Sequence, residues 1–406
     1  MRRSFLFIFS ILLHGYVGLR IVPALSDWPL AALLLASVLA ASALLAPMGV
    51  FARRLRSQRL ARPLLWAGLL CIGLFSSLFV LSVLRDVVLS VAALVLALAP
   101  ALFSLGDVAL ASAVVVPLGA VLVTAFGLLN ARRTAAVVAI DIPSTELPVG
   151  LEGFTIVQIS DVHVGPTIRR PYVEAIVDAV NRLNADMVAV TGDLVDGSVA
   201  ELREDVAPLA RLRSRHGTFF VTGNHDYYSG AHAWIAELRR LGLRVLLNEH
   251  VVLEHKDGAI VVAGVTDPSS HYFDPTHRSS PRAALAGAPS DAAFRLLLAH
   301  QPRSAVAAAD AGFDLQLSGH THGGQFFPWT FVVRWLQPFA TGLHRVRNLW
   351  IYTSRGTGYW GPPKRFGAPS EITLIRLVRA AGATPARVQI KHTTRPGGAE
   401  ASAAAR

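Results

Sequence analysis

The chain has 406 residues, of which 52% are hydrophobic, a composition too apolar for a purely soluble enzyme. The net charge is +11, of which +6 comes from residues 1–150, which contain eleven Arg and five acidic residues. These Arg lie between apolar runs, where they act as topology signals, so the positive charge does not indicate nucleic-acid binding. The single cysteine, Cys71, excludes a disulfide framework and a thiolate cluster within the chain, so a metal site must use His, Asp, Glu or Asn.

Residues 1–133 are expected to form a transmembrane helical domain. The first apolar run follows Arg2 and Arg3, as a signal peptide would. A second run comes at once, however, and no small-residue cleavage site separates the two, so we expect a retained helix. The long apolar runs cover residues 4–25, 29–51, 64–84 and 108–130.

The membrane topology depends on residues 85–105. If this stretch extends the third helix, there are four spans, and the Arg clusters at 53–62 and 132–133 lie in the cytoplasm with the rest of the chain. If residues 87–103 cross alone, there are five spans and the rest of the chain lies outside. We prefer four spans in the inner or plasma membrane, because this arrangement satisfies the positive-inside rule throughout.

After the membrane part, residues 134–150 are predicted to be a linker, and residues 151–380 an α/β domain in which strands alternate with helices. The tail, residues 381–406, is rich in Ala, Gly and Pro and is expected to be disordered. Strands are predicted at 154–160, 186–193, 218–226, 243–254, 258–265, 295–300, 315–320, 349–353 and 371–378. Helices are predicted at 171–184, 201–213, 231–241 and 303–311.

Five short polar motifs each follow a predicted strand. Because ligands of α/β folds bind at the carboxyl ends of strands, these motifs can converge on one point. Within the first and last motifs, the two key residues are two apart in segments taken as extended, which places both side chains on one face. The motifs are Asp161-Val162-His163, Gly192-Asp193-Leu194-Val195-Asp196, Gly223-Asn224-His225-Asp226, Ala299-His300-Gln301 and Gly319-His320-Thr321-His322.

The donors in these motifs predict a binuclear metal centre. Seven side chains are too many for one ion, whereas two ions about 3.5–4 Å apart that share a carboxylate would use them all. Donors of this kind favour two divalent ions, with Mn first and Fe, Zn or Co as alternatives. The candidate ligands are Asp161, His163, Asp193, Asn224, His300, His320 and His322.

The set DxH, GDxxD, GNHD, a lone His and GHTH, in this order, resembles the calcineurin-like metallophosphoesterase superfamily over about residues 151–380. The resemblance implies a metallophosphoesterase fold, a two-sheet β-sandwich flanked by helices, preceded here by about four transmembrane helices. The sequences GHTHGGQ (319–325), SRGTGYWG (354–361) and PSEITLI (369–375) resemble a transmembrane subgroup related to bacterial lipid A-type (UDP-diacylglucosamine) phosphoesterases.

The resemblance also implies roles for individual residues. Asp193 would bridge both ions, and His225 would stabilise or protonate the leaving-group oxygen, oriented by Asp226, because an imidazole paired with a carboxylate keeps a defined tautomer. Asp196 is interpreted as a loop cap or as the partner of a neighbouring residue, with support of a metal ligand as the next alternative. One ion would add Asp161, His163 and His322, and the other Asn224, His300 and His320.

The predicted reaction is hydrolysis of a phosphomonoester or phosphodiester by metal-bound hydroxide. A lipid-linked substrate of the UDP-2,3-diacylglucosamine type, as in lipid A biosynthesis, is the first choice, by analogy and from the membrane anchor. The alternatives are a non-catalytic membrane receptor or scaffold with a metal-binding phosphoesterase-like domain, and an enzyme acting on soluble nucleotides or phosphoproteins.

Three segments near the motifs are open to two interpretations each. Loop 267–282, with His271 and His277, either overhangs the site or is a surface loop. Arg355 either contacts a substrate phosphate or fixes its loop through an ion pair. The apolar stretch 326–340 either covers the core, or dips into the bilayer or grips an acyl chain.

Overall fold

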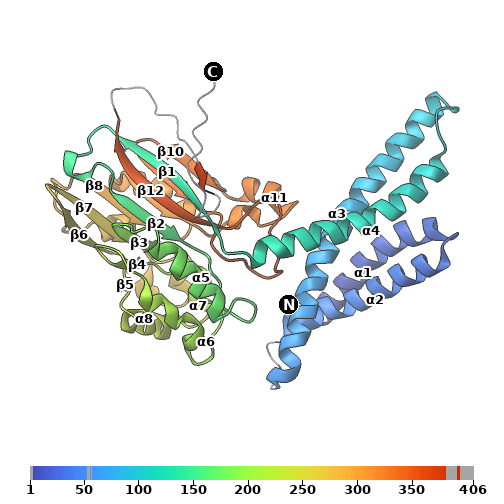
Figure 1. Cartoon of the computed structure of the whole chain (residues 1–406), viewed down its shortest axis with the longest axis horizontal. Coiled ribbons are helices and arrows are strands. Elements are labelled where there is room, and N and C mark those ends of the chain that lie inside the picture. The colour runs from blue at the N-terminus through green and yellow to red at the C-terminus, as the bar shows by residue number, and fades with distance from the viewer. Residues whose placement is uncertain (1–2, 53–54, 56, 381–390, 394–406) are drawn as a thin grey trace. The chain divides into compact units, whose positions relative to one another are not determined.

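The computed structural model describes residues 3–52, 55, 57–380 and 391–393 (Figure 1). The chain forms two compact units, each described here by itself. The helical unit comprises residues 1–133, 326–329 and 359–367. The sandwich unit comprises residues 134–325, 330–358 and 368–406.

Four helices of the helical unit, among the residues described, are long and apolar enough to cross a membrane. Helix α3 runs without a break through residues 85–98, so this stretch extends the third helix, and the expectation of four rather than five candidate spans is confirmed. At 1.5 Å per residue, its 41 residues extend about 60 Å, more than the ~30 Å hydrocarbon core needs. The helices are α1 (Arg3–Ile21), α2 (Pro29–Phe51), α3 (Gln58–Leu98) and α4 (Leu105–Arg132).

Asp86 and Lys364, two charged residues of the helical unit, have hydrogen-bond partners. The Asp86 carboxylate accepts from the Tyr16 hydroxyl at 2.6 Å and pairs with Arg20 at 2.9 Å, which lets α3 continue past a charged residue. Lys364 is 1% exposed, and its Nζ donates to the Gly73 carbonyl at 2.8 Å and to a serine hydroxyl of the same helix at 2.6 Å. A buried ammonium needs such acceptors, because desolvation without them is costly.

The sandwich unit contains two sheets with a common apolar core. One sheet has the strand order β13-β1-β12-β2-β3-β4-β5, and the other β10-β11-β9-β8-β7-β6. Ile156 and Phe219 of the first sheet and Leu296 and Leu315 of the second belong to one buried cluster, which confirms the predicted two-sheet metallophosphoesterase fold. The strands are β1 (Ala136–Ser144), β2 (Thr155–Ile159), β3 (Met187–Val190), β4 (Thr218–Phe220), β5 (Arg244–Val245), β6 (Glu249–His255), β7 (Gly258–Gly264), β8 (Phe294–Leu298), β9 (Leu315–Ser318), β10 (Gly342–Val346), β11 (Leu349–Thr353), β12 (Glu371–Arg379) and β13 (Lys391–Thr393).

Helices flank the two sheets (Figure 1). Helix α5 shows why: Val173, Ile176, Val177 and Val180 recur at helical spacing and are all buried, while the opposite face is polar. The helices of this unit are α5 (Arg170–Asn181), α6 (Val199–Val206), α7 (Asn224–Tyr228), α8 (Ala231–Arg240), α9 (Pro281–Ala284), α10 (Ala305–Ala311) and α11 (Trp329–Leu336), of which Trp329 belongs to the helical unit.

Two predicted boundaries are wrong. Residues 134–150 are not a linker, because β1 pairs in parallel with β12 over its whole length and lies inside the first sheet. The sandwich unit therefore begins at Thr134 and not at residue 151. In the tail predicted to be disordered, residues 391–393 form β13 against β1, whereas residues 381–390 and 394–406 lie outside the described residues.

Candidate metal centre

The five polar motifs follow β2, β3, β4, β8 and β9 directly along the chain. β2, β3 and β4 are parallel neighbours in one sheet, and β8 and β9 are parallel neighbours in the other. The carboxyl ends of parallel neighbours share one edge, so each sheet presents its motifs together. The contacts described below join the two sets, so both sheets contribute to one site.

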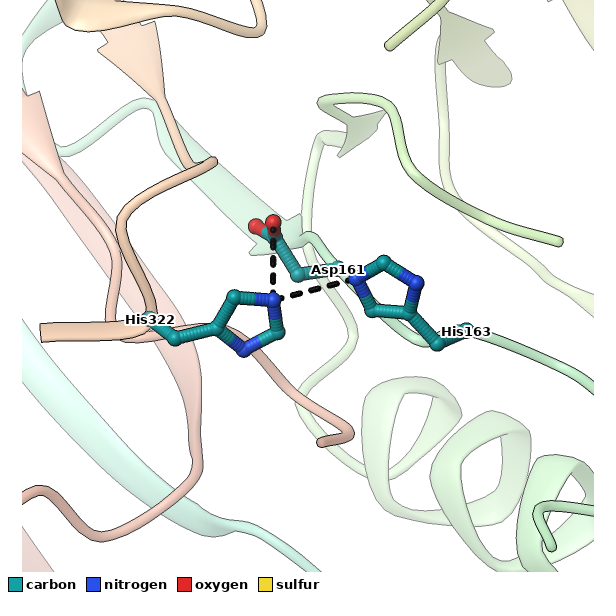
Figure 2. A group of neighbouring side chains, drawn as sticks. All are labelled: Asp161, His163 and His322. Atoms are coloured by element: carbon teal, nitrogen blue, oxygen red, sulfur yellow. Dashed lines mark hydrogen bonds and ion pairs between the residues drawn. The ribbon is translucent and has the colours of Figure 1, made fainter. Parts of the chain in front are cut away.

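The first donor group consists of Asp161, His163 and His322 (Figure 2). Nε2 of His163 lies 3.0 Å from Nε2 of His322, which in turn lies 3.4 Å from Oδ1 of Asp161. Two ligands of one tetrahedral zinc ion lie roughly 3.3 Å apart, given metal–ligand bonds of about 2.0–2.2 Å. The three donor atoms are therefore spaced as the ligands of one ion would be.

The second donor group consists of Asp193, His300 and His320. Nε2 of His300 lies 3.1 Å from Oδ2 of Asp193 and 3.2 Å from Nδ1 of His320. The same Asp193 oxygen lies 3.9 Å from Nε2 of His163, so this carboxylate stands between the two groups. Oδ1 of Asn224 is buried and accepts no hydrogen bond within the described part of the chain, so it fits a ligand role.

The donors converge through left-handed backbone and not through extended segments as predicted. The φ angles are 52° at Asp161, 53° at His163, 50° at Asp193, 72° at His320 and 51° at His322. Each non-glycine residue in this region costs on the order of 1–3 kcal/mol, and such residues persist only where their surroundings hold them. Here the loops hold each other: the His163 N–H donates to the Asp193 carbonyl at 3.1 Å.

Two glycines at the loop corners are required by close packing. Gly192 has a φ of 84°, and a Cβ there would lie 2.7 Å from Nδ1 of His300. A Cβ at Gly319 would overlap the Asp161 carboxylate. Any side chain at these two positions would therefore displace a candidate ligand.

The residue paired with His225 is not Asp226, as we had expected, but Asp196. Oδ1 of Asp196 lies 2.6 Å from Nδ1 of His225, and its other oxygen lies 3.2 Å from Nδ1 of His163. The Asp226 carboxylate instead accepts backbone N–H groups of the GDxxD and GNHD loops. Asp226 thus ties two loops together, and Asp196 positions two imidazoles.

Charge compensation within the group moves the pKa values of its members. Burial opposes ionisation of Asp193, but His300 and His163 hold the pKa of this carboxyl well below its usual range. Burial likewise opposes the protonation of His163, but the Asp196 carboxylate outweighs it and raises the pKa to about 8. Burial and the neighbouring His300 lower the pKa of His320 to about 3. The buried carboxylates thus require positive charge, which protons supply when cations do not.

A cavity of about 360 Å³ opens beside the second donor group. Asn224 and His320 line it together with Pro268, Ser269, His271 and Tyr272, so loop 267–282 does overhang the site. Arg303 also lines this cavity and was not among the predicted site residues, although a basic residue three positions after His300 was a usable signal. Arg355, in contrast, forms an ion pair of 2.6 Å with the buried Glu371 and so fixes its loop.

Comparisons with known proteins agree with this geometry. Residues 154–324 match the model of the calcineurin-like phosphoesterase family. Two relatives named "Transmembrane protein with metallophosphoesterase domain" are similar: the Danio rerio protein is 40% identical over 263 residues and the Bos taurus protein 42% over 265. Each match covers 63% of this chain and 60% of the relative, so the chain matches less than two thirds of either protein.

An uncharacterized metallophosphoesterase of Aquifex aeolicus is 33% identical over 238 residues, which cover 58% of this chain and 89% of that protein. The match therefore includes nearly all of a relative that bears the family name. Together with two donor groups at the ends of two packed sheets, these matches establish that the chain belongs to the calcineurin-like metallophosphoesterase family.

Proposed function

We propose that this chain is a membrane-anchored phosphoesterase that uses two divalent metal ions to hydrolyse a phosphomonoester or phosphodiester bond. The observation that carries the proposal is the position of the Asp193 carboxylate between two groups of buried donors. Two ions bound there would activate water as a nucleophile and neutralise charge on the transferring phosphoryl group.

Neighbouring groups set the orientation of the ligand imidazoles. Nδ1 of His300 faces the Thr191 carbonyl at 2.8 Å, so this nitrogen carries a proton, and Nε2, 3.1 Å from Asp193, is the nitrogen that an ion shared with Asp193 would take as its ligand. Nδ1 of His163 lies 3.2 Å from an oxygen of Asp196, at ion-pair distance but without hydrogen-bond geometry, and its Nε2 points to the first donor group. Such outer contacts fix the tautomer that a metal ligand requires.

We assign His225 as the proton donor to the leaving-group oxygen, with Asp196 as its positioning residue. Nδ1–H of His225 donates to Asp196 at 2.6 Å, which fixes the direction of the ring and leaves Nε2 for the leaving-group oxygen. The His225 ring lies 4.8 Å from the ring of His163, a candidate ligand, so it borders the centre. Arg303, which lines the cavity, supplies positive charge for a substrate phosphate.

We further propose a lipid-linked substrate, of the UDP-2,3-diacylglucosamine type, and a cytoplasmic sandwich unit. Helix α11 supports a lipid-facing role: Phe331, Trp335 and Leu336 are 57%, 89% and 74% exposed. Large aromatic side chains exposed together mark contact surfaces, and Trp favours the membrane interface. The cytoplasmic side follows from the positive-inside rule for the Arg clusters of the helical unit.

The test is turnover of bis-p-nitrophenyl phosphate by the full chain in detergent, with Mn, Fe, Co or Zn supplied in turn. We expect wild-type protein to release p-nitrophenol, and the Asp193→Asn variant to lose both turnover and bound metal. His344→Gln serves as a matched control, because its imidazole hydrogen-bonds the Thr341 carbonyl in the β10 region of the chain. Metal bound without turnover, for every ion, would replace the enzyme proposal with the receptor or scaffold alternative.

A second assay separates the substrate classes. A lipid-linked pyrophosphate in mixed micelles is compared with a soluble nucleotide pyrophosphate of the same headgroup. We expect Trp335→Gln to lower the rate for the micellar substrate several-fold and to leave the soluble one unchanged. Equal rates for both substrates, unaffected by this change, would favour a soluble-nucleotide phosphodiesterase.

A further inference from the structure

Among the described residues, a third group of metal-type donors lies apart from the binuclear centre. It consists of His232, Asp274 and His277, whose donor atoms all lie within 4.8 Å of one another. His232 is at the start of α8 (Ala231–Arg240), and the other two are in loop 267–282. The group therefore joins the overhanging loop to a helix of the sandwich unit.

The distances in this group are close to those of an ion site. Nε2 of His232 lies 3.1 Å from Oδ2 of Asp274, and Nε2 of His277 lies 3.8 Å from the same oxygen. The two imidazole rings are 5.1 Å apart between centroids. Ligands of a tetrahedral zinc ion lie roughly 3.3 Å apart, so the nitrogens need to move by less than about 1.5 Å. The His232 side chain is 71% exposed and has room to do so.

Neighbouring groups already orient two of the three donors. Oδ1 of Asp274 accepts from the backbone N–H of Thr276 at 2.9 Å and from its hydroxyl at 2.6 Å, which turns Oδ2 toward both histidines. Nδ1 of His277 lies 2.8 Å from the Tyr227 hydroxyl. A hydroxyl accepts as well as donates, so it can hold the Nδ1–H tautomer and leave the Nε2 lone pair directed at Asp274.

We propose that His232, Asp274 and His277 form a third divalent-cation site, suited to zinc, which fastens loop 267–282 over the catalytic cavity. Two imidazoles and one carboxylate, with a fourth position left for water, are a common ligand set for zinc. The simpler alternative, an ion pair between His232 and Asp274 without a metal, is what the experiment must exclude.

The site would act on substrate binding through its loop. Pro268, Ser269, His271 and Tyr272 of this loop line the cavity beside Asn224 and His320. Asp274 is two residues beyond Tyr272, so an ion there restrains the wall of the cavity and not the catalytic donors. Zinc at this site should therefore change the KM for substrate and leave kcat unchanged.

The direct test counts bound zinc in the full chain, purified in detergent, stripped with a chelator and re-equilibrated with buffered zinc. We expect His232→Ala to bind one zinc fewer than wild type, and the control His344→Ala to bind the same number. The comparison is repeated in an Asp193→Asn background, which impairs the binuclear centre, and the same difference of one is expected. The difference does not depend on how many ions the binuclear centre holds, so failure of that proposal would not affect it.

A second readout does not use activity. Arg278 lies in the loop and is exposed, so trypsin reports loop opening there. Zinc at ten times its dissociation constant should slow this cleavage about tenfold in wild type, because opening requires the ion to leave. His232→Ala should show no such protection. Equal zinc counts in wild type and His232→Ala, or protection that persists in the variant, would overturn the proposal.

Discussion

Replacing Asp226 by Asn should destabilise the sandwich unit strongly, because this carboxylate is a buried acceptor for four backbone donors. One oxygen accepts from Gly223 at 2.7 Å and Asp193 at 3.0 Å, and the other from Leu194 at 3.0 Å and Val195 at 3.3 Å. The Asn amide keeps one acceptor and puts an NH₂ group at the other position. Whichever way it turns, two buried N–H groups then face a donor.

The expected loss follows from these two groups. A buried donor without an acceptor costs about 1–3 kcal/mol, so two of them cost roughly 2–6 kcal/mol in the free energy of unfolding. For a domain of 150–250 residues each kcal/mol lowers the Tm by about 2–4 °C, so a fall on the order of 10 °C is expected. Thermal unfolding of the detergent-solubilised protein, with chelator present, measures this without a contribution from bound ions.

Asp196→Asn is the matched comparison, because it makes the same chemical change in a carboxylate that contacts imidazoles. Its remaining oxygen can still accept from His225 or His163, so the Tm should change little. Turnover should fall by about 10–100-fold, as is typical when a residue that orients metal ligands is changed. The fall in turnover should be larger for esters with poor leaving groups than for esters with good ones, because poor leaving groups need a general acid. If Asp226→Asn kept its Tm and lost turnover selectively with poor leaving groups, our assignment of the two carboxylates would be wrong.

Three further results are expected. Metal affinity should rise with pH through about 8, because the pKa of His163 is raised to about 8 and a bound ion must displace that proton; titration calorimetry in two buffers counts the protons released. Lys364→Met should lower the free energy of unfolding of the helical unit by about 1–3 kcal/mol, because two hydrogen bonds are lost. Lys256→Met, in a surface turn, should leave the free energy of unfolding unchanged. Urea unfolding measures the stability of both variants. Thr145→Cys in a Cys71→Ala background should react with an impermeant maleimide only after cells are opened, and labelling of intact cells would place the sandwich unit outside.

The convergence of the donors within each sheet could be predicted from sequence because it depends on local order. Each motif follows an apolar strand, and neighbouring parallel strands end at one edge. The same reasoning failed at β1. Its partner β12 lies more than 200 residues away along the chain. Proline is tolerated at a sheet edge, and β13 pairs with β1 only at residues 137–139, so Pro143 lies beyond that described pairing. Pairing at that separation is not encoded in the short segment itself.

The partner of His225 could not be predicted because it depends on the local backbone. His225 and Asp226 are consecutive residues of α7 (Asn224–Tyr228), and adjacent residues on a helix point in different directions. The side chain that reaches Nδ1 of His225 comes instead from Asp196, on the preceding loop. A motif written as letters places Asp226 next to the histidine and Asp196 29 residues before it, so it gives no sign that Asp196 is the partner.

The left-handed backbone at five candidate ligands bears on how the site forms. At about 1–3 kcal/mol each, five such residues cost about as much as the whole stability of a typical domain, so other interactions must offset them. Cross-loop hydrogen bonds contribute to this: the Asp161 N–H donates to the Gly192 carbonyl at 3.0 Å, and the Val164 N–H to the Leu194 carbonyl at 2.8 Å. Protein groups thus tie the loops to one another. Chelated protein should therefore keep its circular dichroism spectrum while losing turnover, and loss of the β-sheet signal on chelation would show that the ions, and not the loops, hold the site together.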